Sequence, residues 1–91
     1  MLIVHALLEL SLPYVQSLKG RRKIVASIKD RLKNKNISLL DVSTEYPKEA
    51  QIALCFLSPN EAEAQKKLQT IEKVMERYFS DIEYHLSYEL L

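Results

Sequence analysis

The fold is decided by residues 17–35, SLKGRRKIVASIKDRLKNK, which have the spacing of an amphipathic helix. Its apolar side chains fall within one arc of about 120° when successive residues are placed 100° apart. They are Leu18, Ile24, Val25, Ile28 and Leu32. Ser17 is the predicted N-cap, since its hydroxyl can accept from a first-turn amide. Residues 34–36, NKN, are predicted to close the helix, because asparagine tolerates the left-handed cap conformation.

The same segment is strongly basic. It carries eight of the thirteen Lys and Arg residues of the chain and one acid, Asp30, for a net charge of +7. The other five bases and eleven acids give −6, so the overall charge of +1 conceals a marked asymmetry. Five of the cations are predicted to face solvent: Lys19, Arg22, Lys23, Lys29 and Lys33. Arg21 differs because its angle falls inside the apolar arc, where it either reaches past the rim of a sheet or pairs with a carboxylate.

Four other stretches predict strands. Residues 2–12 and 82–90 alternate between two faces, which is the period of a strand with one face in a core. Residues 37–43 and 50–57 are the remaining two, and the almost continuously apolar 50–57 is expected near the centre of the sheet. Pro13 ends the first strand because it donates no ladder hydrogen bond. The turn residues in 44–49, TEYPKE, predict a longer hairpin loop.

A second helix is predicted after residues 58–61, SPNE. Ser58 at the N-cap, Pro59 at the first helical position and Glu61 at the third would form a capping box. The apolar side chains that follow share one arc of a helix. They are Ala64, Leu68, Ile71, Val74, Met75, Tyr78 and Phe79.

The element order βαββαβ predicts an α+β fold of the ferredoxin-like sandwich type. We expect a four-stranded antiparallel sheet in the order 4-1-3-2, with two helices on one face. The 91 residues are expected to form a single domain, 1–91, because one glycine and no low-complexity tract leave no sign of a linker. No apolar run approaches the 18 residues of a membrane span. With a single cysteine as well, the sequence predicts a cytoplasmic protein.

The start of the basic helix also carries a motif, P-x-x-x-S-L-K-x-[KR]-R, formed by Pro13 and residues 17–22. The likeness continues through residues 30–32 and 36–38, the strand start at Ala50 and the terminal 88–91, and so covers nearly the whole chain. This pattern resembles the bacterial YlxP-like domains of unknown function. The resemblance implies a ferredoxin-like fold and no established enzymatic activity. It also implies a cytoplasmic protein often encoded among translation-factor and ribosome-maturation genes.

The sequence gives little support for a catalytic site or a metal site. Cys55 has His5 and His85 as candidate partners, but it lies in the most apolar run, where a small buried thiol is unreactive. Adjacent first and fourth strands would bring the two histidines near each other on the open face, which is more typical of surface pairing than of a metal site. The nucleotide and protease motifs GxGxxG, P-loop and HExxH are absent. The sequence therefore predicts no catalytic residue, metal, cofactor, small-molecule substrate or membrane contact.

The basic helix is the stronger functional candidate. Its first-turn amides and the positive end of its dipole form an anion site, where Gly20 exposes backbone to an approaching phosphate. The predicted contacts are Ser17, Lys19, Gly20, Arg21, Arg22, Lys23, Lys29 and Lys33. A continuous positive face of this kind suits an RNA backbone, and ribosomal RNA or the ribosome is the predicted partner. Base stacking on the sheet is not expected, because Phe56 and the tyrosines of the last strand are predicted to face the helices.

Two alternatives stay open. The charged face is either functional or only solvated, although it lacks the interleaved acids usual on a solvated face. The other alternative is a homodimer or a protein–protein interaction module that uses the open sheet face. Ile3 and Leu7, together with Ala53 and Leu57, would then form the partner surface. The salt dependence of binding distinguishes RNA binding from protein–protein interaction, since only phosphate contacts weaken steeply with ionic strength.

Overall fold

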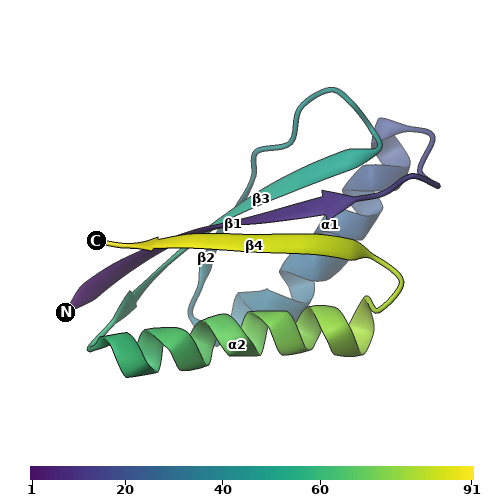
Figure 1. The fold of residues 1–91 in the computed structure, drawn as a ribbon. Coiled ribbons are helices and arrows are strands. Elements are labelled where there is room, and N and C mark those ends of the chain that lie inside the picture. Colours follow the sequence, from purple (N-terminus) through teal and green to yellow (C-terminus); the bar gives the residue numbers. More distant parts are fainter.

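The computed structural model describes residues 1–91 and has the expected βαββαβ order (Figure 1). Its elements are β1 (Leu2–Ser11), α1 (Leu18–Leu32), β2 (Ser38–Asp41), β3 (Glu49–Ser58), α2 (Glu61–Tyr78) and β4 (Glu83–Leu90). A short 3-10 turn, Lys33–Lys35, extends α1. The predicted strands are all present, and β2 is the one that is clearly shorter than expected.

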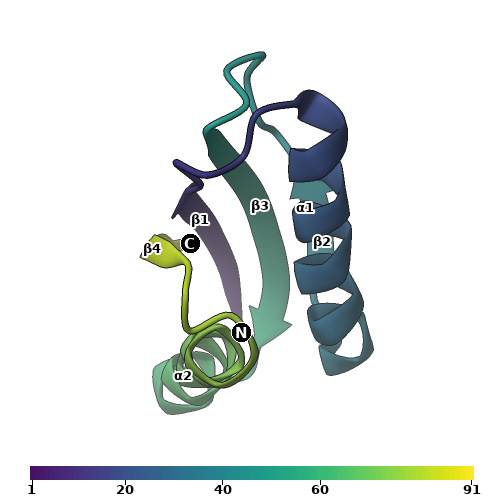
Figure 2. The same ribbon diagram turned by 90° about the vertical axis from the view of Figure 1, so that its right-hand side faces the viewer.

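The four strands form one antiparallel sheet in the order β2-β3-β1-β4. Read from the opposite edge, this is the predicted order 4-1-3-2. β1 lies between β3 and β4, so that Val4 is opposite Phe56 on one side and Leu90 on the other. Figure 2 shows the two helices on the same side of the sheet, with α1 near β2 and β3 and α2 below β4.

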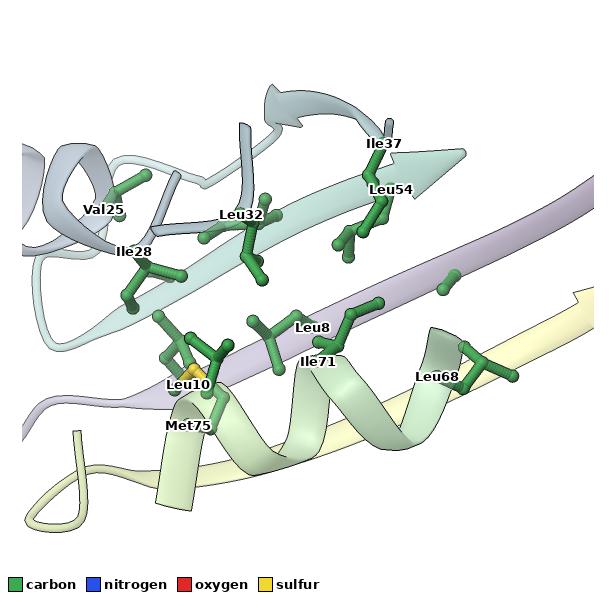
Figure 3. Packing of buried hydrophobic residues seen from close by; sticks show 14 of the residues in the cluster. Leu8, Leu10, Val25, Ile28, Leu32, Ile37, Leu54, Leu68, Ile71 and Met75 are labelled. Atoms are coloured by element: carbon green, nitrogen blue, oxygen red, sulfur yellow. The ribbon is translucent and has the colours of Figure 1, made fainter. Parts of the chain in front are cut away.

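One face of the sheet and the inner sides of both helices form a single core of 20 buried apolar residues. In Figure 3, Leu8 and Leu10 of β1 lie opposite Ile71 and Met75 of α2, while Ile28 and Leu32 approach from α1. From Val4 to Leu10 the even-numbered residues of β1 are buried and the odd-numbered ones are not, as the alternation predicts. Burying one leucine or isoleucine side chain stabilises by about 1.5–3 kcal/mol, so this face holds the helices in place.

Both predicted ends of α1 are confirmed. The Gly20 N–H donates to Ser17 Oγ at 3.1 Å, and Asn36 takes the left-handed conformation with φ of 59°. A Cβ at position 20 would lie 3.3 Å from Ser17 Oγ and 3.7 Å from Val15 Cγ1. Glycine at this position therefore gives the capping hydroxyl room to approach the backbone.

The start of α2 corrects the prediction. Ser58 is still part of β3, and the helix begins at Glu61 with Asn60 as N-cap, whose side chain accepts from the Glu63 N–H at 2.9 Å. The Ser58 hydroxyl instead donates to the Asn60 carbonyl at 2.7 Å. The capping box fails because β3 keeps Ser58 extended, which moves the cap two residues along the chain.

Another correction concerns Tyr78 at the other end of α2. It was expected in the core but is 44% exposed. Its ring lies under the guanidinium of Arg31, which is 3.8 Å from the ring centroid. The contact is a cation–π interaction that joins the ends of the two helices.

We expect Asn60→Ala to lower the free energy of unfolding by about 1 kcal/mol, because the Glu63 amide loses its acceptor. Urea denaturation of the purified protein measures this change. Asn60→Asp is the matched control and should keep the stability, since aspartate is an equally good cap. An Asn60→Ala protein as stable as the parent would contradict this assignment.

Candidate nucleic-acid interface

The solvent-facing cations of α1 lie along one side of the helix. Lys19, Arg22, Lys23 and Lys33 are exposed and Lys29 is half-buried. At 100° per residue the five fall within an arc of about 120°. They span Lys19 to Lys33, about 21 Å at 1.5 Å per residue. We call these five residues the basic arc.

Most of the basic arc has no acidic partner. The structure contains two ion pairs, Lys33–Asp30 at 2.7 Å and Lys66–Glu63 at 3.3 Å, and only the first involves the arc. The hydrogen bond and charge of Lys33 hold the pKa of the Asp30 carboxyl below its usual value. Both side chains of this pair are more than half exposed, and exposed pairs of this kind contribute little stability. Lys33 can therefore leave Asp30 for another anion.

Arg21 must be removed from the predicted phosphate contacts. It is only 5% exposed, and its Nη1 donates to three backbone carbonyls: Thr44 at 2.6 Å, Tyr46 at 2.8 Å and Glu49 at 3.3 Å. Of the two options for its inward angle, pairing with a carboxylate is not realised. Its side chain instead reaches the end of the sheet, where its partners are carbonyl oxygens of the β2–β3 loop and of the first residue of β3. Its Nε is buried without a partner. Arg21 is thus a structural cation that ties α1 to this loop.

Lys48 has a similar role that the sequence did not indicate. Its ammonium donates to the carbonyls of Pro13 at 2.8 Å and Val15 at 3.0 Å. The two side chains together fix the β1–α1 and β2–β3 loops at one end of the sheet. A lysine in a turn-rich stretch carries no pattern that predicts such contacts.

Asp41 supplies negative charge beside Arg21. Burial disfavours its charged form, but hydrogen bonds from Ser43 and the positive charges of Arg21 and Lys29 outweigh that effect and hold the pKa of Asp41 below its usual value. The Ser43 N–H donates to Asp41 Oδ1 at 2.9 Å. The carboxylate therefore stays ionised and offsets part of the buried cationic charge.

Ser17 and Gly20 occupy the predicted place but are already bonded to each other. The Gly20 amide donates to Ser17 Oγ, so it is not free to meet a phosphate in this conformation. The next amide, that of Arg21, donates to the Ser17 carbonyl at 3.1 Å. The amides of Leu18 and Lys19 are the first-turn donors that remain.

A shallow groove separates α1 from the edge strand β2. It has a volume of about 410 Å³ and is lined by Ala26, Lys29, Asp30, Lys33, Ile37 and Leu39. Two members of the basic arc thus border a hollow next to a strand.

The open face of the sheet has the opposite charge. Its side chains include Glu9, Glu49, Glu83 and Glu89 and no lysine or arginine, as the strand register shows. No aromatic side chain lies on this face. Phe56 is buried against the helices, and the tyrosines of β4 lie on the helix side, as the alternation predicts.

The apolar side chains of the open face are divided. Ile3, 41% exposed, is opposite Leu57, 60% exposed. A second apolar row consists of half-buried Leu7, Ala53 and Leu40. Between these two rows runs a polar one that consists of Ser38, Cys55, His5 and Glu89. Leu40, 63% exposed, was not among the predicted residues of the open face, although the alternation of Ser38 and Leu40 indicates that it lies there.

The positions of the cysteine and the histidines also differ from expectation. Cys55 is exposed, not buried, and lies opposite His5. His5 and His85 do not face each other, because His5 is opposite Glu89 and His85 is opposite Glu9. No group of three or more histidine, cysteine or acidic side chains is placed to hold a metal ion.

These features define a small α+β domain whose positive charge lies on one helix and whose open sheet face is acidic. A family model described as protein of unknown function (DUF503) matches residues 3–87, and the chain belongs to this family. A search of curated proteins finds no match. Neither helix combines the length and the apolar composition that crossing a bilayer requires.

We expect Arg21→Leu to lower the free energy of unfolding by about 3 kcal/mol, because three part-buried hydrogen bonds from a charged donor to backbone carbonyls are lost. Arg22→Leu, one residue further along, is the control and should change stability by less than about 0.5 kcal/mol, since Arg22 is exposed. Chemical denaturation of both variants measures the difference. Equal stability of the two would contradict the structural role of Arg21.

Proposed function

We propose that this protein binds structured RNA, foremost ribosomal RNA, through the basic arc of α1. It acts without catalysis in bacterial translation or ribosome maturation. The observation that carries the proposal is the basic arc itself, in which Lys19, Arg22, Lys23 and Lys29 form no ion pair. Cations held along a rigid helix neutralise phosphates and release counterions, which favours association with a nucleic acid.

The sheet supports this choice of surface by its charge. A phosphate backbone is repelled by the four glutamates of the open face, and this face offers no aromatic side chain on which a base could stack. RNA is therefore expected to approach from the side of α1. Recognition there depends on shape and charge, because lysine and arginine contacts to phosphates carry no base sequence.

The proposal also includes a finer assignment of the fold class and of the family. The element order and the strand order support the ferredoxin-like class, and the motif of Pro13 and residues 17–22 supports the YlxP-like assignment. A cytoplasmic location and a ribosomal partner are what that resemblance implies. Fold class alone does not carry function, so the proposal rests on the arc.

We expect Arg22→Glu combined with Lys23→Glu to weaken binding to structured RNA roughly tenfold or more at low salt, because two cations become repulsive. The slope of log K against log salt should fall by about two. Lys66→Glu combined with Lys73→Glu is the matched control, with the same change in charge at exposed positions of α2. It should keep most of the affinity, and binding is measured with a labelled ribosomal RNA fragment over a salt series.

Co-sedimentation with ribosomal subunits tests the partner. Comigration with one subunit at low salt and its loss at high salt support the proposal. If the two double variants bind RNA equally well, α1 is not the contact surface. If the protein stays at the top of the gradient in both salts, the ribosome is not the partner.

The second function, a homodimeric module that uses the open sheet face, is favoured by the exposure of Leu57 and Ile3. The polar row of Ser38, Cys55, His5 and Glu89 divides this apolar surface, and the glutamates of two such faces would repel each other. We therefore favour RNA binding over a dimer formed through the open face. An open-face dimer would persist at high salt.

A further inference from the structure

Strand β4 forms an edge of the sheet with unpaired backbone groups. Ile3 and Leu91 exchange both of their backbone hydrogen bonds, at 3.0 and 2.8 Å. In an antiparallel pair such residues alternate, so the backbone of His85, Ser87 and Glu89 faces β1. The N–H and C=O groups of Tyr84, Leu86, Tyr88 and Leu90 must then point away from the sheet. These four residues offer a regular row of donors and acceptors.

The two edges of the sheet differ in how they are protected. β2 is only four residues long, and a short edge strand is a poor template for a further strand. β4 has eight residues in unbroken register with β1, and it contains no proline, glycine, lysine or bulge. Of the devices that block a free edge, β4 has only glutamates near its ends.

We infer that β4 pairs with β4 of a second copy of this chain, antiparallel about a two-fold axis at Ser87. This register places Tyr84 opposite Leu90 and Leu86 opposite Tyr88 of the other copy, so all four outward-pointing residues gain backbone partners. Tyr88 is 45% exposed, and it gains an apolar neighbour across the new pairing.

Charge selects this register over the neighbouring one. With the axis at Ser87, His85 of each copy is opposite Glu89 of the other, and the imidazole can donate to the carboxylate. With the axis at Leu86, Glu83 would be opposite Glu89 at both ends, and like charges directly opposite each other destabilise a strand pair. With the axis at Tyr88, His85 would be opposite Leu91 and Glu89 opposite Ser87, so both histidine–glutamate pairs would be lost. Of these three registers, only the one about Ser87 places Glu89 opposite a histidine and no like charges opposite each other.

The pairing also extends a pattern already present within one copy. His5 is opposite Glu89 and Glu9 is opposite His85 across β1 and β4. Joining two copies continues each pair into a row that reads His5, Glu89, then His85 and Glu9 of the second copy. Histidine and glutamate alternate along the whole row, and the row occurs twice because of the two-fold axis. The isolated edge leaves Glu89 and His85 with a neighbour on one side only.

This dimer is independent of the proposed RNA surface. α1 lies toward β2, away from β4, so the basic arcs of the two copies stay uncovered (Figure 2). The interface also differs from an open-face dimer, because the sheet is extended at its edge and the open face stays accessible.

Crosslinking tests the register. In a Cys55→Ser background, Ser87→Cys places two thiols directly opposite each other at a Cα separation of about 4.5 Å, which a disulfide spans. Mild oxidation of the full chain, without RNA, is expected to give a covalent dimer on a non-reducing gel. Ala53→Cys in the same background is the control. It lies on β3, two strands from the edge, and should not crosslink.

Solution mass tests the association itself. Light scattering after size-exclusion chromatography should give about 21 kDa, twice the 10.6 kDa chain. His85→Glu should raise the dissociation constant about tenfold or more, because it faces Glu89 of the other copy. His5→Glu makes the same substitution opposite a glutamate of its own chain and should have a much smaller effect. A monomer at high concentration, crosslinking at position 53, none at 87, or equal effects of the two histidine variants would each overturn the inference.

Discussion

The buried guanidinium of Arg21 is the interaction on which the placement of α1 depends. A cation taken out of water is stable only if other dipoles replace its solvation, and here three backbone carbonyls at the β2–β3 connection do so. Arginine suits this role because its charge is delocalised and less strongly hydrated than an ammonium. The contacts join the first turn of α1 to a loop more than twenty residues away. The direction of the basic arc follows from this attachment, since Arg22 and Lys23 are carried on the same turn.

The sequence predicted the elements, the sheet order and the core side of β1 and β4, because their alternation and helical spacing are strong and local. The sequence-based prediction failed where the same residue pattern is compatible with two different structural positions. Cys55 shares the phase of Ala53 and Leu57, which the sequence placed on the open face, but the almost continuously apolar run 50–57 suggested burial on both faces, and the uncovered sheet leaves Cys55 exposed. Ser58 and Asn60 are both good caps, and the length of β3 decides between them. Arg21 was recognised as anomalous, but no local pattern indicates the loop carbonyls that surround it.

Segregation of charge gives the molecule two electrostatically different sides. The helix layer presents α1 with its mostly unpaired cations, and the open face presents four glutamates and no lysine or arginine. This separation orients an approaching polyanion before any contact forms, because attraction on one side and repulsion on the other act over about a Debye length. Arg31 stays outside the arc, since it is stacked on Tyr78 and links α1 to α2.

The proposed strand pairing at β4 and the proposed RNA contact at α1 should respond differently to salt, because different forces act at the two surfaces. Phosphate contacts owe most of their free energy to released counterions, so they weaken as ionic strength rises. Strand pairing owes most of its free energy to backbone hydrogen bonds and apolar side chains, and salt screens only its histidine–glutamate pairs. High salt should therefore remove bound RNA while leaving two copies joined. A dimer with both arcs uncovered could contact one RNA twice, which raises avidity without any new contact within either copy.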